Sequence, residues 1–477
     1  MVGITSAGAY IPYRRLSREL IGKAWNRNSL KGERSIANND EDSITMAVEA
    51  ASNCIGSEPR ESVEALLFAS TSAPYKEKLS AGLVSTVCNL RDQVFTADYA
   101  NSLRAGTAAL RSAINMVKAG DAGRVLVTAA DCRLGYPKSD EEQLLGDGAA
   151  AIMVGDKGII ATVEATFSIN KEIVDVWRND KDQFVRTGES RFIMTEGYNA
   201  CMKEAVTGIL KKSGLTPGDI QKVVLTTPNM KANLDLAKKT GFDTKTQVQD
   251  NLMLSVGNCG SAQPLMLLTA ALEDAKPGDL ILLAGYGDGA DAFIFKATDE
   301  INKFKPLSSI EKYLRNKSML STYQLYLSFR GIIEPMPGEP FRLFPSNSAY
   351  WREQESILQF LGSRCKKCGA SIFPIQRICF SCGAKDEFDK IPCYSKKGKV
   401  FTYSIDKLAG RSDEPVVIQT VVDADDRTRF YLIMTDYDPS ELKVGLEVEF
   451  TFREIYKGAN FNNYYWKCRP VRNGGAS

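Results

Sequence analysis

The stretch GDGAAAIMVG at residues 146–155 returns later in the chain as GDGADAFIFK at residues 287–296. Each copy follows, in the same order, a helical pattern, a turn and an apolar strand-like run. A short string of Gly and Ala recurs easily by chance, but this whole order of elements does not. The repeat therefore predicts two related α/β halves, at about 1–160 and 195–297, joined by a less regular insert.

Apolar runs separated by helical patterns continue this rhythm over residues 1–300. The runs at 123–131 and 279–287 are continuously apolar, which is typical of strands buried on both faces. One helix is predicted over 39–55 with its apolar residues on one face, and another ends at Gly120, a natural helix stop. We expect a largely parallel, layered sheet covered by helices.

The stretch GYGDGA at residues 285–290 formally matches the GxGxxA fingerprint of dinucleotide-binding proteins. That fingerprint needs a helix directly after it. Here residues 291–296 alternate like a strand. We therefore reject a nucleotide-binding function for this motif.

The composition is that of a soluble globular protein, with 44% hydrophobic and 25% charged residues in a chain of 477. This length predicts about two or three domains. A net charge of +2 gives no reason to expect nucleic acid or an anionic membrane as a partner, and no apolar run approaches the ~20 residues of a membrane span. The first residues lack the pattern of a secretory signal, and the eleven cysteines include two CxxC pairs, so we expect a cytoplasmic protein.

The chain contains no histidine. Nucleophile pairs of the Ser-His-Asp and Cys-His kinds need an imidazole, so both are excluded. Any catalysis must use a carboxylate, Tyr, Lys, Cys, backbone amides or a metal.

Two CxxC units predict a metal site at residues 351–394. Cys365 and Cys368 form the first unit, Cys379 and Cys382 form the second, and ten residues separate the two. Two such units place four thiolates around one Zn²⁺ and leave no open position. The sequence therefore predicts a zinc ribbon whose zinc is structural.

Five β-rich runs follow the ribbon, with Gly, Asp or Pro between them. Five strands at this spacing suggest a small OB-type β-barrel at 395–477. Such barrels often bind nucleic acid, and the aromatic residues Phe461, Tyr464, Tyr465 and Trp466 could stack bases. The acidic stretches between the runs argue against a phosphate backbone and favour a ligand-binding or interaction module.

Residues 301–350 differ from both neighbours and predict a linker. Their first part is basic, aromatic and helical in pattern, and residues 334–348 contain four prolines. Tyr323, Tyr326 and Phe329 could mark a binding face, although packing within the protein is the favoured interpretation.

Together these features resemble a known arrangement. Residues 1–297 resemble the hydroxymethylglutaryl-CoA synthase branch of the thiolase superfamily, through EDSITMAVEAA, RAGTAAL, LLGDGAAAIMVG, SVGNCGSA and AKPGDLILLAGYGDGADAF. Residues from about 345 to 477 resemble the zinc-ribbon/OB-fold family that accompanies these enzymes. The resemblance implies a duplicated five-layer αβαβα fold, and an OB module that binds the CoA part of acyl thioesters and ties partner subunits together. It also implies that the zinc holds this module rigid.

The sequence departs from the family at its catalytic positions. The resemblance places the nucleophilic Cys at Leu103, the His at Thr226 and the Glu base at Thr71. An acyl-enzyme at Leu103 is chemically impossible. The neighbouring Ser102 has no histidine to activate it.

Other parts of the family's pocket are present. Asn258 matches an Asn whose amide can hold a thioester or enolate oxygen, and residues 285–289 match a glycine-rich loop whose amides line the pocket. Several side chains near this pocket are candidate acid–base groups, with packing or turn roles as the alternative for each: Tyr286, Asp288, Tyr99 and Cys259.

Three functions remain open. The first is a non-covalent aldol or retro-aldol reaction on a β-hydroxyacyl-CoA, because this chemistry needs a base and enolate donors but no acyl-enzyme. The second is a catalytically inactive subunit that scaffolds an active thiolase and channels CoA esters through its OB domain. The third, Claisen condensation by this chain alone, is opposed by Leu103 and Thr226, and only an acyl adduct on Cys259 or Cys88 would support it. The resemblance also implies a homodimer or a hetero-oligomer with a thiolase-like subunit.

Overall fold

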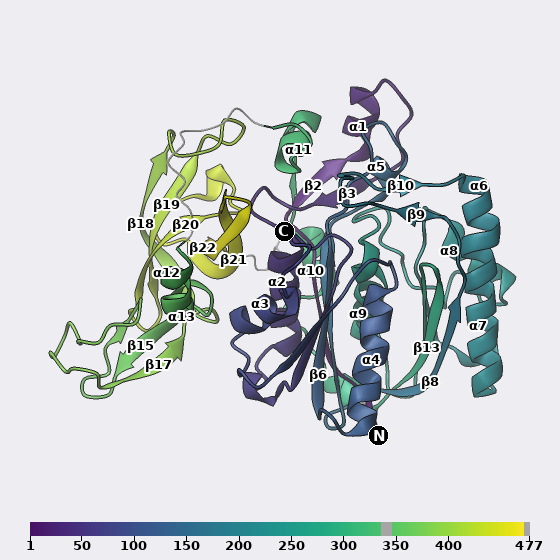
Figure 1. Cartoon of the computed structure of the whole chain (residues 1–477), viewed down its shortest axis with the longest axis horizontal. Coiled ribbons are helices and arrows are strands. Elements are labelled where there is room, and N and C mark those ends of the chain that lie inside the picture. Colours follow the sequence, from purple (N-terminus) through teal and green to yellow (C-terminus); the bar gives the residue numbers. More distant parts are fainter. Residues whose placement is uncertain (335–345, 472–477) are drawn as a thin grey trace. The chain divides into compact units, whose positions relative to one another are not determined.

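The structure is a computed structural model that describes residues 1–334 and 346–471 (Figure 1). It consists of two compact units. The first holds residues 1–326 apart from 39–41, and the second holds 39–41 together with the chain from Leu327 onward.

The first unit contains one continuous sheet with the strand order β11-β12-β13-β8-β1-β7-β6-β4-β5. These strands are β1 (Gly3–Tyr10), β4 (Ala65–Ala69), β5 (Phe95–Tyr99), β6 (Arg124–Asp131), β7 (Gly148–Gly155), β8 (Ala161–Asn170), β11 (Lys222–Leu225), β12 (Leu280–Tyr286) and β13 (Gly289–Ala297).

The sheet confirms that the chain is duplicated. Outward from the pairing of β1 with β8, one half reads β1-β7-β6-β4 and the other reads β8-β13-β12-β11, so both follow the same topology. The two copies of the repeat form the equivalent strands β7 and β13. The second half begins with β8 (Ala161–Asn170), so the irregular insert between the halves is shorter than predicted.

The sheet is mixed, which corrects the expectation of a largely parallel one. β4 pairs in parallel with β5 and β6, and β11 with β12, but the strands between them pair antiparallel. A continuous apolar run indicates that a strand is buried on both faces. Helices can bury both faces of a sheet whether its strands pair parallel or antiparallel. After Gly285 the chain turns directly from β12 into β13, so no helix follows the GYGDGA motif, as predicted.

Helices and the sheet halves of the first unit form five layers. Helix α2 (Ser43–Ile55) covers β1, β7 and β6. Helices α4 (Ala105–Ala119) and α9 (Gln263–Glu273) lie between the two halves, and α7 (Ala200–Ser213) covers β8, β13 and β12. Figure 1 shows α2 and α7 on opposite sides of this unit, with α4 and α9 between them.

Alternation along the strands explains how both faces are filled. In β12, Leu282 and Ala284 pack in one apolar cluster with α7, whereas Ile281 and Leu283 pack in another with α4 and α9. Successive side chains of a strand point to opposite faces, so a strand between two helical layers is apolar at every position.

Both predicted helices form, although α2 begins at Ser43 and not at residue 39 as predicted. Asp42 and Thr45 make a reciprocal capping box at the start of α2. Helix α4 ends at Gly120, whose φ of 81° is a left-handed conformation that glycine adopts without strain.

Shorter elements complete the first unit: α1 (Arg18–Ala24), α3 (Ser80–Val87), α5 (Glu141–Leu144), α6 (Ser190–Phe192), α8 (Ala232–Lys239), α10 (Ile310–Arg315), β2 (Arg14–Ser17), β3 (Glu33–Ile36), β9 (Val176–Trp177), β10 (Arg186–Thr187) and β14 (Ser318–Met319). Helix α11 (Tyr323–Phe329) carries the aromatic residues of the predicted linker, and Tyr323 packs edge-on against Trp25. The prolines of that linker lie outside the described residues. Among the helices of the described ranges, none is both long and apolar enough to cross a membrane.

The second unit contains a small sheet and a closed barrel. The sheet is β16-β15-β17, formed by β15 (Leu361–Cys365), β16 (Ser371–Ile372) and β17 (Phe388–Pro392), and α12 (Asn347–Arg352) and α13 (Gln354–Ile357) precede it. The barrel order is β18-β19-β20-β22-β21, formed by β18 (Lys397–Asp406), β19 (Val417–Ala424), β20 (Arg429–Met434), β21 (Glu447–Gly458) and β22 (Phe461–Pro470). The predicted small barrel is therefore confirmed.

Aromatic side chains fill this barrel. Trp466 stacks on Phe360 with ring centroids 5.1 Å apart, and Tyr464 stacks on Phe452 at 5.4 Å. Trp466 and Tyr464 are 5% and 3% exposed. Two of the four aromatic residues considered for base stacking are therefore core residues.

Candidate functional site

A cavity of about 320 Å³ opens in the first unit and draws residues from both halves of the duplication. Leu103 precedes α4, Thr226 follows β11, and Tyr286 ends β12. Asn258 lies on the segment that leads into α9. The volume is at the lower end of the range of ~300–1,000 Å³ for small-molecule sites.

Of the three positions where the resemblance places catalytic residues, Leu103 and Thr226 line this cavity. The glycine-rich hairpin packs against Leu103, because a Cβ at Gly287 would lie 2.8 Å from the Leu103 Cβ. The Thr226 hydroxyl accepts a hydrogen bond from the Tyr286 amide at 3.0 Å, which pins the hairpin. Thr71 is not among the lining residues, and its hydroxyl donates to Asp131 at 3.0 Å.

A tyrosine–carboxylate pair lies in the wall of the cavity. The Tyr286 hydroxyl donates to Asp175 Oδ2 at 2.6 Å, and the two residues are 8% and 3% exposed. Burial raises the pKa of Asp175 above its usual range, and burial together with this hydrogen bond raises the pKa of Tyr286. Gly197 is required here, because a Cβ at this position would lie 2.4 Å from the Tyr286 hydroxyl.

Hydrogen bonds fix the amide of Asn258. Its Nδ2 donates to the Thr227 carbonyl at 3.0 Å, and its Oδ1 accepts from Arg133 Nη2 at 3.0 Å and from the Gly260 amide at 2.9 Å. Within the described part of the chain, these bonds use one of the two N–H groups of the amide.

The other candidates of the sequence analysis lie outside the cavity lining. Asp288 accepts a hydrogen bond from Ser102 at 2.9 Å, and Tyr99 lies on β5. Cys259 and Cys88 are 0% exposed. Burial raises the pKa of Cys88 to about 11 and that of Cys259 higher still, which opposes the thiolate that a nucleophile needs.

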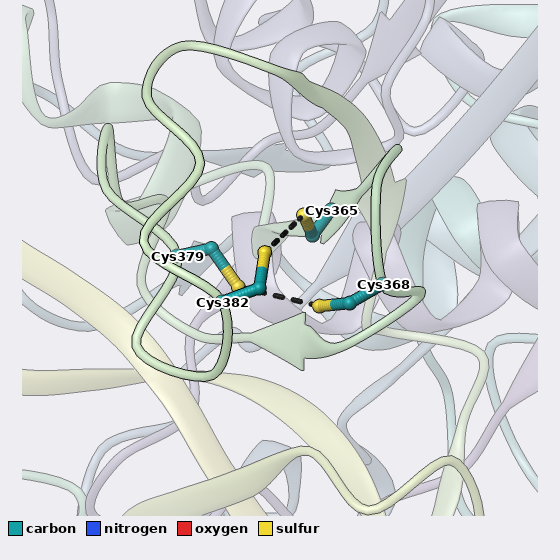
Figure 2. A group of neighbouring side chains, drawn as sticks. All are labelled: Cys365, Cys368, Cys379 and Cys382. Atoms are coloured by element: carbon teal, nitrogen blue, oxygen red, sulfur yellow. Dashed lines mark hydrogen bonds between the residues drawn. The ribbon is translucent and has the colours of Figure 1, made fainter.

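The four cysteines of the predicted ribbon form a compact cluster in the second unit (Figure 2). Their sulfur atoms all lie within 4.8 Å of one another, with Cys365 and Cys382 at 3.7 Å and Cys368 and Cys379 at 3.5 Å. Tetrahedral Zn²⁺ with bonds of ~2.3 Å requires S···S distances of about 3.8 Å, so the cluster fits zinc.

Glycine makes each metal-binding turn possible. The amides of Gly369 and Gly383 donate to the carbonyls of Cys365 and Cys379, both at 2.9 Å. Their φ values are 75° and 71°, a conformation that other residues rarely adopt. The Cys-Gly at the end of each CxxC unit is thereby explained.

Both units of the chain match known protein families. The family model for the C-terminal part of 3-oxoacyl-[acyl-carrier-protein] synthase III matches residues 210–295, and the model for the ChsH2 rubredoxin-like zinc ribbon matches residues 356–388. The hydroxymethylglutaryl-CoA synthase of Aeropyrum pernix is 33% identical over 341 residues, which cover 69% of this chain and 94% of the relative. The hydroxymethylglutaryl-CoA synthase of Methanopyrus kandleri is 33% identical over 343 residues, which cover 97% of that relative.

The chain belongs to the hydroxymethylglutaryl-CoA synthase family.

Solved structures support the same fold for this family member. A crystal structure of HMG-CoA synthase complexed with CoA matches with a TM-score of 0.63 at 19% identity, over 72% of this chain and 95% of that one. The 3-oxoacyl-[acyl-carrier-protein] synthase III of Aquifex aeolicus matches with a TM-score of 0.57 at 23% identity, over 62% of this chain and 100% of that one.

Sequence reasoning missed two side chains of this family member's cavity. Arg133 lies two residues after the buried strand β6, a place where a charged side chain could have been noticed. Asp175 lies on the segment that follows β8 in the second half, where no motif surrounds it.

Proposed function

We propose that this chain binds CoA thioesters in the cavity and cleaves or forms a carbon–carbon bond without a covalent intermediate. The most specific form of this proposal is an aldol or retro-aldol reaction on a β-hydroxyacyl-CoA. The family's relatives are named as hydroxymethylglutaryl-CoA synthases, and one solved structure of the same fold is complexed with CoA. These names support the substrate class.

One observation supports the reaction type: Tyr286 donates a hydrogen bond to Asp175 in the wall of the cavity that Leu103 also lines. In this proposal the pair is the acid–base group, because Leu103 cannot act as a nucleophile. The raised pKa of Asp175 brings this carboxylate closer to the working pH of a general base.

The proposed cleavage conserves atoms and electrons. Tyr286 passes its proton to Asp175 while it takes the proton of the substrate's β-hydroxyl. The electron pair of the Cα–Cβ bond moves to Cα and the thioester oxygen, so Cβ becomes a carbonyl and the remainder becomes an enolate. The enolate then takes the stored proton at Cα. The products together are isomeric with the substrate, and neither water nor a redox partner is consumed.

The test is product analysis with purified protein and a panel of β-hydroxyacyl-CoAs. We expect the wild type to release an acyl-CoA and a carbonyl compound, and Asp175→Asn and Tyr286→Phe to lower the rate about 100-fold or more. Asp219→Asn, a change of an exposed carboxylate far along the chain, is the matched control and should leave the rate unchanged. The proposal is refuted if the wild-type chain leaves every substrate intact, both alone and with a thiolase-like partner.

Three residues favour a second function, that of an inactive subunit. The family resemblance places a Cys at Leu103, a Glu at Thr71 and a His at Thr226, and this chain lacks all three. The chain would then be an inactive subunit that scaffolds an active thiolase and channels CoA esters through its barrel. This function predicts a stable complex with a cysteine-bearing thiolase. It also predicts that the partner loses activity when this chain is omitted.

A further inference from the structure

Arg133 is a buried cation in the wall of the cavity. It is 4% exposed and lines the cavity together with Asn258 and Tyr286. Its Nη2 donates to Asn258 Oδ1 at 3.0 Å, but its Nε finds no acceptor within the described ranges. Its hydrogen-bonded partner is therefore a neutral amide.

The carboxylate of Asp131 acts on Arg133 but already accepts hydrogen bonds from other groups. Asp131 lies at the end of β6, and its negative charge acts on Arg133. Both of its oxygens accept hydrogen bonds from other groups: Oδ1 from Ser70, Thr71 and Ser72, and Oδ2 from Ser261. Among the described residues, no carboxylate forms an ion pair with Arg133.

Gly260 leaves room at the guanidinium. A Cβ at this position would lie 2.8 Å from Arg133 Nε and 2.3 Å from Asp131 Oδ2. The φ of Gly260 is 59°, so the backbone here also favours glycine. Arginine and aspartate can approach this turn because it carries no side chain.

A buried charge without a paired counter-ion destabilises a protein, so its presence in a cavity calls for a functional explanation. Burial lowers the pKa of Arg133, yet a guanidinium stays protonated at physiological pH. The missing partner is therefore an anionic oxygen that arrives with a ligand or develops during a reaction.

We propose that Arg133 binds the thioester oxygen of the substrate and neutralises the negative charge that develops there as the enolate forms. Asn258 is a positioning residue in this assignment, since its Oδ1 holds the guanidinium through Nη2. The assignment rests on the proposed function, because the aldol reaction passes through this enolate. A guanidinium in a site that excludes water is a strong stabiliser of such charge.

The test separates enolate formation from bond cleavage. Pentanoyl-CoA has no β-hydroxyl and cannot be cleaved, but a base can remove its Cα proton. The C–H electron pair then moves toward the thioester oxygen, and a deuteron returns to Cα when the solvent is D₂O. Mass spectrometry of recovered pentanoyl-CoA measures this exchange.

We expect exchange by the wild type and a loss of about 100-fold or more in its rate for Arg133→Gln. Arg133→Lys, which keeps the charge, should recover part of the rate. Arg124→Gln, at the opposite end of β6, is the matched control and should exchange normally. Arg133→Gln should unfold at the same temperature as the wild type or higher, whereas loss of a purely structural arginine would lower it.

The outcomes distinguish this assignment from the proposed function. Exchange that depends on Arg133 supports the assignment even if no β-hydroxyacyl-CoA is cleaved, in which case the aldol proposal fails alone. Exchange that survives Arg133→Gln overturns the assignment, and so does a wild type that exchanges no acyl-CoA. A last measurement compares the binding of glutaryl-CoA, an ester that ends in a carboxylate, to the wild type and to Arg133→Gln. If the substitution weakens only this binding and pentanoyl-CoA still exchanges, Arg133 recognises a substrate carboxylate. That result overturns the enolate assignment.

Discussion

At the scale of residues, the cavity combines groups that are far apart in the chain. Tyr286 and Asp175 are separated by 111 positions, and Arg133 and Asn258 by 125. In each pair, one residue lies in a recognisable sequence motif (Tyr286 and Asn258) and the other does not (Asp175 and Arg133). The arrangement of these side chains therefore depends on the fold and not on their proximity in the sequence.

Asp175 sets the expected pH dependence of cleavage. It must be ionised to accept a proton, and burial raises its pKa, so the rate should fall on acidification at a pH above ~3.9, the usual pKa of aspartate. A pH–rate profile measures this, and Asp175→Asn should give a low and flat profile. An unchanged acidic limb in that variant would assign the titration to another group.

The raised pKa of Asp175 also makes the free energy of unfolding depend on pH, in the direction opposite to that of activity. The folded state holds this proton more tightly than the unfolded state, so the contribution of Asp175 is present at low pH and is lost as pH rises through its folded pKa. Asp175→Asn should therefore lose activity without loss of stability at pH 8, as urea unfolding can show.

At the scale of elements, α9 and α10 meet at the half-buried carboxyl group of Glu273. The amide of Ile310, the first residue of α10, donates to both oxygens of Glu273 at 3.1 and 3.2 Å. Burial raises the pKa of Glu273 to about 7, from an ordinary value of 4.5. Glu273 therefore stabilises the fold most below pH 4.5, and this contribution is lost as pH rises to about 7.

Glu273→Gln should remove this dependence, because an amide keeps an acceptor for Ile310 and never ionises. We expect the variant to be more stable than the wild type at pH 8 by about 1–2 kcal/mol, after allowance for the partial exposure of the carboxyl group, with a smaller difference at pH 5. Urea unfolding at both pH values measures this. Glu204→Gln, an exposed change on α7, should show no such gain, and a gain of the same size there would refute the argument.

The edge of the sheet predicts an interface. Strand β5 pairs with β4, and within the described ranges its other side has no strand beside it. Phe95 on this strand is 56% exposed. An open strand edge with an exposed aromatic residue is suited to association, which agrees with the dimer that the family resemblance implies.

Phe95→Lys should weaken a dimer formed through this edge, because a lysine on an edge strand opposes pairing. We expect at least ~10-fold weaker self-association, equal to about 1.4 kcal/mol, by sedimentation equilibrium. Leu408→Lys, an exposed change in the second unit, is the control. A wild type that stays monomeric, or a variant that dimerises as before, would contradict this prediction.

At the scale of the whole molecule, regular patterns were predictable and isolated contacts were not. The duplicated halves, the barrel and the four cysteines of the ribbon follow from repeats and spacing, which are local properties of the sequence. The mixed strand directions were missed, because burial on both faces gives the same apolar run in either direction. Asp175 and Arg133 were missed because their roles arise from contacts with Tyr286 and Asn258 that only the folded chain creates.

The zinc cluster should stabilise the second unit without acting in the reaction. Little apolar core surrounds its ligands, so we expect the metal to stabilise the fold of the ribbon. We expect one zinc per chain by elemental analysis, and Cys379→Ser should lose it and lower the unfolding temperature of the second unit. Cys132→Ser, outside the cluster, should retain the metal. Full zinc content in Cys379→Ser would show that the cluster is not the site.

If carbon–carbon chemistry occurs in this cavity without an acyl-enzyme, the chain stays unmodified during turnover. Intact-protein mass spectrometry during turnover of a β-hydroxyacyl-CoA tests it most directly, with the released products measured in the same sample. We expect an acyl-CoA and a carbonyl product while the mass of the chain stays unchanged. An acyl adduct on the chain, or an absence of products with and without a partner, would contradict it.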